Sequence, residues 1–253
     1  MKNLIKFGLL ALVLSFSSCN KDDDSDGGLP GNNLNTGSSA RDILSAERFG
    51  KMTIEVQYPA GFAPAAGVIS EMQLFLSRYC NKPDGIEIVP REITTPDGDS
   101  YDFDDIRAIE KSKREIFNSG NNLALYIFFS DKEFSGNEGN QFTLGAAYQN
   151  TSTVIFLKTI RDNIGGLGAP SEALLTSTVL HHELGHLMGL VNLGTAQQQP
   201  HEDAEHEKHC NVESCLMYWA VESQAGLGMV GGMSSAPDFD AQCKADLKAN
   251  GSK

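Results

Sequence analysis

The residues best suited to chemistry form one short run, His182-Glu183-Leu184-Gly185-His186. Two histidines four positions apart share one face of a helix, so both imidazoles can bind the same metal ion. Zinc suits such a pair, because it takes nitrogen ligands tetrahedrally and in catalytic sites keeps one position open for water. Glu183 lies one residue along, where it can reach that water. The pattern predicts a zinc-dependent hydrolase with Glu183 as the general base.

The segment around this run is expected to be a buried helix. Ser171 provides an N-terminal cap, and the helical pattern continues to about Leu190. Apolar residues precede and follow the motif, as a helix packed behind a metal site requires. His181 points about 100° away from His182 around the helix axis, so we expect it to pack against neighbours and not to bind the metal.

The composition limits the possible functions. The chain has 253 residues, of which 33 are acidic and 20 basic, and 40% are hydrophobic. The apolar fraction is sufficient for a folded core. A net charge of −13 argues against a nucleic-acid partner, because few cations are present to neutralise phosphates. The long apolar run is confined to the N-terminus, which excludes a multi-pass membrane protein.

The N-terminus is predicted to be an export signal. Residues 1–18 contain two lysines, then an apolar stretch and two serines, directly before Cys19. This arrangement resembles a bacterial lipoprotein signal, in which Cys19 receives lipid. Residues 19–40 are polar and are expected to form a flexible tether. Lys21 and the aspartates after it resemble the surface-export tag of Bacteroidetes lipoproteins, which implies an outer-membrane lipoprotein exposed at the cell surface.

The remaining chain has the pattern of alternating strands and helices. This alternation predicts an α/β layer followed by a smaller and irregular lobe. The expected strands are residues 51–58, 85–89, 123–129, 143–149 and 153–160, and the expected helices are residues 64–79, 103–118, 171–190 and 238–249.

The residues after the helix indicate a family resemblance. Gly189 extends the motif to His-Glu-x-x-His-x-x-Gly, which resembles the opening of the metzincin metalloprotease signature. The position where metzincins carry their third ligand holds Asn192, whose amide is a poor zinc ligand. Further on, the run from His209 to Met217 resembles the archaemetzincin ending. That resemblance implies that His209 is the third zinc ligand and that Met217 forms the Met-turn beneath the metal.

Other residues compete for these roles. His206, His201 and Asp203 are rival third ligands in the charged segment before His209. A gluzincin-type protease, whose third ligand is a glutamate, is an alternative with these candidates: Glu202, Glu205 and Glu207. A further alternative is a non-catalytic surface lipoprotein that binds a metal. The later cysteine pair of archaemetzincins is incomplete here, so the remaining cysteines could form disulfides or a structural metal site: Cys80, Cys210, Cys215 and Cys243.

The metzincin resemblance implies an α/β (α+β) zincin fold, with a twisted and mostly parallel five-stranded sheet. Residues 41–253 would form a single catalytic domain, divided into subdomains at 41–190 and 191–253. The resemblance also implies one catalytic Zn²⁺, a protein or peptide substrate and a monomer. Gly145, Ala146 and Ala147 resemble the edge strand along which a metzincin substrate lies extended, which is a form of strand addition.

We predict that mature protein begins at a lipid-modified Cys19 and is recovered with membranes. Mass spectrometry of the N-terminal peptide should give the mass of the modified cysteine, and a Cys19→Ala variant should lose it. Unmodified N-terminal peptide from another position, or release of the wild type into the medium, would contradict this prediction.

Overall fold

The computed structural model describes residues 28–65, 67–139, 141–166 and 168–253. The predicted signal and the predicted lipidation site Cys19 lie outside these residues. Among the described helices, none is long and apolar enough to span a membrane. The elements are these, in chain order: α1 (Ala40–Leu44), β1 (Lys51–Pro59), α2 (Val68–Tyr79), β2 (Ile86–Ile93), β3 (Ser100–Tyr101), α3 (Phe103–Lys113), β4 (Asn122–Phe129), β5 (Glu133–Phe134), β6 (Gly145–Gln149), β7 (Ser152–Ile155), α4 (Leu157–Asn163), α5 (Glu172–Leu187), the 3₁₀ helix η1 (Trp219–Glu222), α6 (Ala225–Val230) and α7 (Ala241–Ala249).

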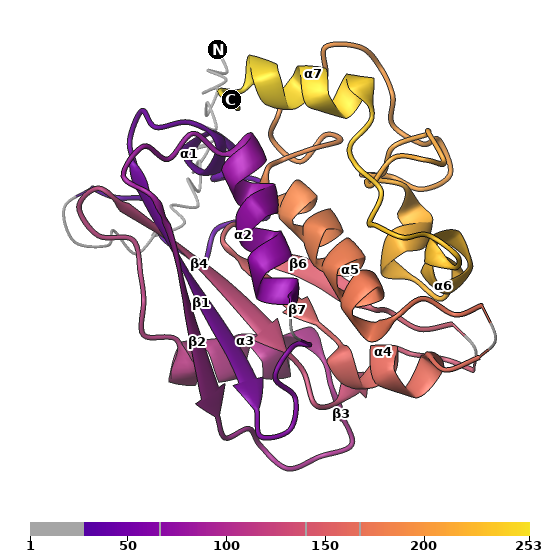
Figure 1. Ribbon diagram of the computed structural model, residues 1–253. Coiled ribbons are helices and arrows are strands. Elements are labelled where there is room, and N and C mark those ends of the chain that lie inside the picture. The colour runs from indigo at the N-terminus through magenta and orange to yellow at the C-terminus, as the bar shows by residue number, and fades with distance from the viewer. Residues whose placement is uncertain (1–27, 66, 140, 167) are drawn as a thin grey trace, which may run out of the picture.

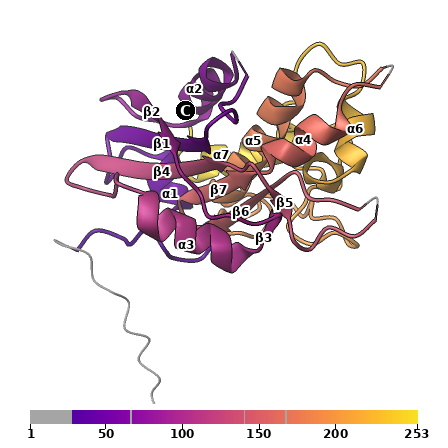
Figure 2. The same cartoon turned by 90° about the horizontal axis from the view of Figure 1, so that it is seen from below.

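The main sheet has five strands in the order β2-β1-β4-β7-β6, and this confirms the predicted mostly parallel architecture. The first four strands run parallel, and β6 pairs antiparallel with β7 at one edge. Helices α2 and α5 cover one face of the sheet and α3 covers the other (Figures 1 and 2). The central strand β4 is apolar and buried on both faces from Leu123 to Phe129, as expected of a central strand in a parallel sheet.

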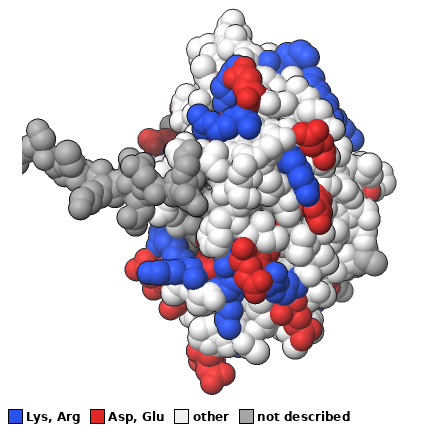
Figure 3. Space-filling model, turned by 90° about the vertical axis from the view of Figure 1, so that its left-hand side faces the viewer, with Lys and Arg blue, Asp and Glu red and all other residues white. Residues whose placement is uncertain are grey.

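Two cores lie on opposite faces of β4. Leu125 and Ile127 face the larger core beneath α2 and α5. Tyr126 and Phe128 face the smaller core beneath α3. The alternation follows from the two-residue period of a strand. On the face shown in Figure 3, acidic and basic side chains lie next to one another, so this face has no continuous patch of one sign.

The expected strand 85–89 continues to Ile93 and the expected helix 64–79 begins at Val68, and two further elements differ in kind or in their end. The expected strand 153–160 ends at Ile155, and the chain then forms α4, which packs Leu157 and Ile160 into the core. An apolar run of this kind fits a strand or a buried helix equally well. The expected helix 103–118 ends at Lys113, because the extended Arg114 carries its buried guanidinium to Glu110 and to the carbonyl of Ala124.

The packed region also begins earlier than Arg41. Asn32 donates hydrogen bonds to the side chain of Asn118 and to the carbonyl of Ala124. The backbone N–H of Leu34 donates to Asn150, whose own N–H donates to the carbonyl of Leu34. Residues 29–39 are therefore a strap across the domain, and the expected tether at 19–40 is shorter at its C-terminal end.

We predict that Lys82→Met destabilises the domain. The buried ammonium of Lys82 donates to three backbone carbonyls, at Asp42, Ser45 and Phe49, and thereby connects α1 to the sheet. Methionine keeps the length of the side chain but leaves those carbonyls without their donor, which should cost about 2–4 kcal/mol. Urea unfolding measures this cost. The exposed Lys111→Met is the control, and an equal effect of both variants would rule out the proposed role.

Candidate metal centre

Helix α5 carries the motif and is buried almost throughout. Ser171 caps it by accepting a hydrogen bond from the N–H of Leu174. His182 and Glu183 are fully buried, and His186 is 5% exposed. His181 points elsewhere and stacks on Phe75 with 4.1 Å between ring centroids. Burial lowers the pKa of His181 to about 4, and the positive charge of Arg78 adds to this effect.

Three imidazoles converge beneath the sheet edge, and we call them the histidine cluster: His182, His186 and His209. The Nε2 atoms of His182 and His186 are 3.1 Å apart. The ring of His209 lies 5.3 Å from that of His182 and 5.2 Å from that of His186, between centroids. The structure thus brings together the two helical histidines and the residue that the resemblance implied as third ligand.

The other ring nitrogens orient two of these imidazoles. Nδ1 of His182 donates to the carbonyl of Leu216 over 2.7 Å, and Nδ1 of His209 donates to the carbonyl of Glu207 over 3.0 Å. A proton on Nδ1 leaves the Nε2 lone pair free for a metal. Metal-binding histidines in proteins are held by such bonds as a rule.

The spacing of these nitrogen atoms fits a zinc ion. Zinc–nitrogen bonds of about 2.0–2.1 Å at tetrahedral angles place two ligand atoms about 3.3 Å apart. The separation of 3.1 Å between Nε2 of His182 and Nε2 of His186 agrees with that value. Burial strongly lowers the pKa of His186, and the neighbouring His182 lowers it further, so the imidazole is neutral as a metal ligand must be.

Met217 lies directly beneath this helix. A Cβ atom added to Gly185 would lie 2.3 Å from the sulfur of Met217 and 3.1 Å from the ring of Phe239. Glycine at position 185 therefore allows the methionine to approach the turn of α5 between the two histidines. Gly189 ends the helix at φ 74°, where a Cβ would lie 2.7 Å from Ala40.

Glu183 has the environment of a general base. Its side chain is fully buried, and neither carboxylate oxygen has a hydrogen-bond partner among the described residues. Burial raises its pKa well above the usual carboxyl range, and repulsion from Glu222 adds to the shift. A Cβ on Gly145 would lie 3.0 Å from a Glu183 oxygen, so the glycine makes room for this carboxylate.

Glu222 is a site residue that the sequence analysis missed. Its carboxylate oxygens lie 3.7 Å, 3.9 Å and 3.2 Å from the Nε2 atoms of His182, His186 and His209, respectively. Burial opposes its ionisation, but the adjacent imidazoles of His182 and His209 outweigh that effect and hold its pKa well below the usual range. The one available signal was its position, five residues after Met217.

A cavity of about 170 Å³ opens beside the histidine cluster, and Ala146 and Ala147 of β6 line it. The N–H of Phe156 donates a hydrogen bond to the carbonyl of Leu144. In an antiparallel pair, successive residues point their backbone groups alternately toward and away from the partner strand, so those of Gly145 and Ala147 point away from β7. The carbonyl of Ala147 accepts a hydrogen bond from the hydroxyl of Thr36 on the strap. The predicted edge strand is therefore the border of this cavity.

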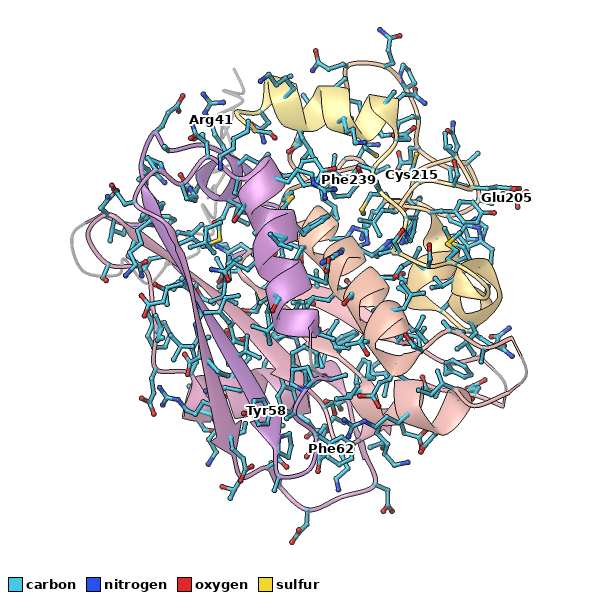
Figure 4. All side chains as sticks on the ribbon, viewed as in Figure 1. Arg41, Tyr58, Phe62, Glu205, Cys215 and Phe239 are labelled. Atoms are coloured by element: carbon cyan, nitrogen blue, oxygen red, sulfur yellow. The ribbon has the colours of Figure 1, made fainter. Side chains whose placement is uncertain are left out.

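The rival third ligands lie elsewhere. Asp203 accepts hydrogen bonds from His206, whose ring stacks on Trp219 with 4.2 Å between centroids. His201 belongs to a second cluster. Asn192 lies at φ 64° and donates to Glu202. Figure 4 shows Glu205 at the right-hand outer edge of the molecule. None of the glutamates proposed for the gluzincin alternative belongs to the histidine cluster: Glu202, Glu205 and Glu207.

The second cluster, which we call the cysteine cluster, consists of His201, Cys210, Cys215 and Cys243. Nδ1 of His201 lies 3.4 Å from the sulfur of Cys210 and 3.9 Å from that of Cys243, and the sulfurs of Cys215 and Cys243 are 3.7 Å apart. Nε2 of His201 donates a hydrogen bond to the carboxylate of Asp246 over 2.7 Å. No disulfide joins the described cysteines.

This donor set fits a structural zinc ion. Three cysteines and one histidine can form a closed tetrahedral zinc site, the carboxylate of Asp240 lies within 4.8 Å of His201, Cys210 and Cys243, and the buried Asp246 orients the histidine ring. Hydrogen bonds from Cys215 and Cys243 lower the pKa of Cys210 below its usual range, which favours the thiolate form that a metal needs. Cys80 lies apart in the main core, where burial raises its thiol pKa to about 12.

The sheet order and the arrangement of α5 define an archaemetzincin-like fold. Archaemetzincin from Methanopyrus kandleri is similar with a TM-score of 0.54 and 17% sequence identity, over 80% of this chain and 97% of that one. Metalloproteinase-II from Bacteroides fragilis has a TM-score of 0.43 and 13% identity, over 81% of this chain and 54% of that one. No protein-family model and no curated protein matches the sequence. At this level of sequence identity, the similarity in structure establishes the fold alone.

We predict about two zinc ions per chain, one at each cluster. His209→Ala should remove one of them and lower the unfolding temperature, because an ion that binds only the folded chain stabilises it. Cys243→Ser should remove the other and lower the unfolding temperature by about 10 °C or more, because metal binding contributes directly to folding. Elemental analysis with thermal unfolding tests both, and Cys80→Ala is the control for metal content. Wild-type protein with one zinc, unchanged in Cys243→Ser, would contradict the second site.

Proposed function

We propose that the protein is a zinc-dependent endopeptidase of metzincin type. The observation that carries this proposal is the meeting of three imidazoles with a buried Glu183, whose carboxylate makes no close hydrogen bond among the described residues, at the border of one cavity. A site that served only to hold a metal would need the ligands but would have no use for such a carboxylate. The similarity in fold to an archaemetzincin supports the proposal.

His182, His186 and His209 would hold the ion, each through Nε2. A zinc ion held there supplies a water of lowered pKa and an electrostatic partner for the scissile carbonyl oxygen. Glu183 accepts the proton of the attacking water and then delivers it to the leaving amide nitrogen. Burial raises its pKa above the usual carboxyl range, which is the direction that helps a carboxylate to hold the proton between the two steps.

The substrate would lie extended along β6. The outward backbone groups of Gly145 and Ala147 can pair with a peptide in the manner of an added strand, and their small side chains leave space for its backbone. A second cavity of about 500 Å³ adjoins this edge and is lined by Thr143 and Trp219, among others. We propose that this cavity takes a substrate side chain next to the cleaved bond.

We further propose that the enzyme acts as a monomer at the outer surface of a bacterial outer membrane, held by lipid on Cys19. The support for this placement is the sequence of residues 1–26, with its signal-like start and acidic tether. A membrane anchor and a peptide substrate are the partners that this proposal requires.

We predict that Glu183→Gln keeps the zinc but lowers peptide hydrolysis at least about 100-fold, since general-base catalysis contributes roughly 10²–10⁴-fold. A fluorogenic peptide library provides the substrate, and elemental analysis provides the metal content. Glu213→Gln, at an exposed position of the same lobe, is the matched control. Near-wild-type turnover in Glu183→Gln would exclude it as the base, and a wild type that cleaves no peptide would favour a metal-containing binding protein.

A further inference from the structure

Glu222 occupies the position where a catalytic metal site would be expected to stay open. It is the last residue of η1, and its carboxylate lies within 3.2–3.9 Å of all three Nε2 atoms of the histidine cluster. Neighbouring ligand atoms on a tetrahedral zinc ion are about 3.3 Å apart. Oε2 of Glu222 faces His182 and His186 and Oε1 faces His209, and one donor atom from each of the four residues lies within 4.8 Å of the others, close enough for one ion to be shared by all four.

The chemistry of the donors agrees with this geometry. Three neutral imidazoles leave the charge of a zinc ion uncompensated in a buried site, and a carboxylate offsets part of it. Glu183 does not compete for this role, because its carboxylate is not among the donor atoms that lie within 4.8 Å of one another. Glu222 and Glu183 thus have different positions relative to the imidazoles.

We propose that Glu222 is a fourth protein ligand of the metal, which closes the coordination shell in the resting enzyme. This inference rests on the proposed function of the histidine cluster. Catalytic zinc keeps a position for water, whereas a shell of four protein ligands is closed. The resting protein is therefore self-blocked, and hydrolysis begins when the carboxylate of Glu222 leaves its place.

The surroundings of Glu222 allow that movement. Its backbone is fixed, because its carbonyl accepts a hydrogen bond of 2.8 Å from the N–H of Leu144, and a bridge joins Ser223 to Thr143. Its side chain is 29% exposed, on the side of the cavity. Rotation of the side chain alone can carry the carboxylate into solvent. Since Leu144 directly precedes Gly145, a peptide that pairs with β6 arrives next to this anchor.

The test uses cobalt-loaded protein and azide, a small anion that binds only to a metal with a free position. Visible absorption spectra are recorded for wild type, Glu222→Gln and Glu222→Ala during azide titration. The buried cysteine cluster has no free position and contributes nothing to the azide-induced change. We expect azide to bind Glu222→Ala at least about 10-fold more tightly than wild type, and chelator competition to give at least about 10-fold weaker zinc binding in that variant.

Two controls make the result decisive. Glu205→Ala removes an exposed carboxylate of the same lobe and should match wild type in both measurements. Glu222→Gln keeps the volume of the side chain, so it separates loss of a ligand from loss of packing, and it should also bind azide more tightly. Equal azide affinity in wild type and both Glu222 variants, with unchanged zinc affinity, would overturn the proposal.

The outcomes also separate this inference from the proposed function. If azide and zinc affinities change as expected but no variant cleaves peptide, Glu222 is a ligand and the endopeptidase proposal fails. If wild type cleaves peptide and binds azide as tightly as Glu222→Ala does, the endopeptidase proposal is supported and the proposal that Glu222 is a ligand is refuted. A chain that takes up no cobalt at the histidine cluster would refute both.

Discussion

The arrangement of the C-terminal part of the molecule depends on one short distance, the 3.1 Å between Nε2 of His182 and Nε2 of His186. Nδ1 of His182 carries the proton that it donates to Leu216, so its Nε2 presents a lone pair to Nε2 of His186. At this distance either a proton on Nε2 of His186 or a metal cation bound by both atoms must lie between them, and a zinc ion has the matching ligand spacing. The bond from His182 to the carbonyl of Leu216 and the contact of Met217 with Gly185 fix the geometry that the cation needs.

The same requirement explains why residues 191–236 can be so irregular. Their secondary structure is limited to η1 and α6, and hydrogen bonds to side chains replace a regular ladder. In this lobe, apolar burial is supplied by a few residues such as Leu216, Met217 and Val230. Metal ligation stabilises small lobes of this kind, because the ligands converge only in the folded chain.

Local sequence patterns predicted much of this structure, but they could not predict contacts between residues far apart in the sequence. The spacing of His182 and His186 placed both on one face of a helix, and the apolar run of β4 indicated a strand buried on both faces. The apolar residues after Ile155 are compatible with the period of a strand and with that of a helix, so the pattern alone does not distinguish α4 from a continued strand. Glu222 and His201 carry no motif of their own. Their roles come from contacts with Leu144 and Asp246, far away in the sequence, which no spacing rule reveals.

The two clusters are mechanically connected through one short segment. His209 belongs to the histidine cluster and Cys210, the next residue, belongs to the cysteine cluster. The N–H of Cys210 donates to the carbonyl of Met217 over 2.8 Å, and the N–H of Met217 donates to the sulfur of Cys215. A metal at the cysteine cluster would thus hold both ends of the run that supplies the third imidazole and the supporting methionine. His209 stands outside the helix that fixes its two partners, so its position depends on this segment, and an ion that the reaction never touches would help to keep the reactive site assembled.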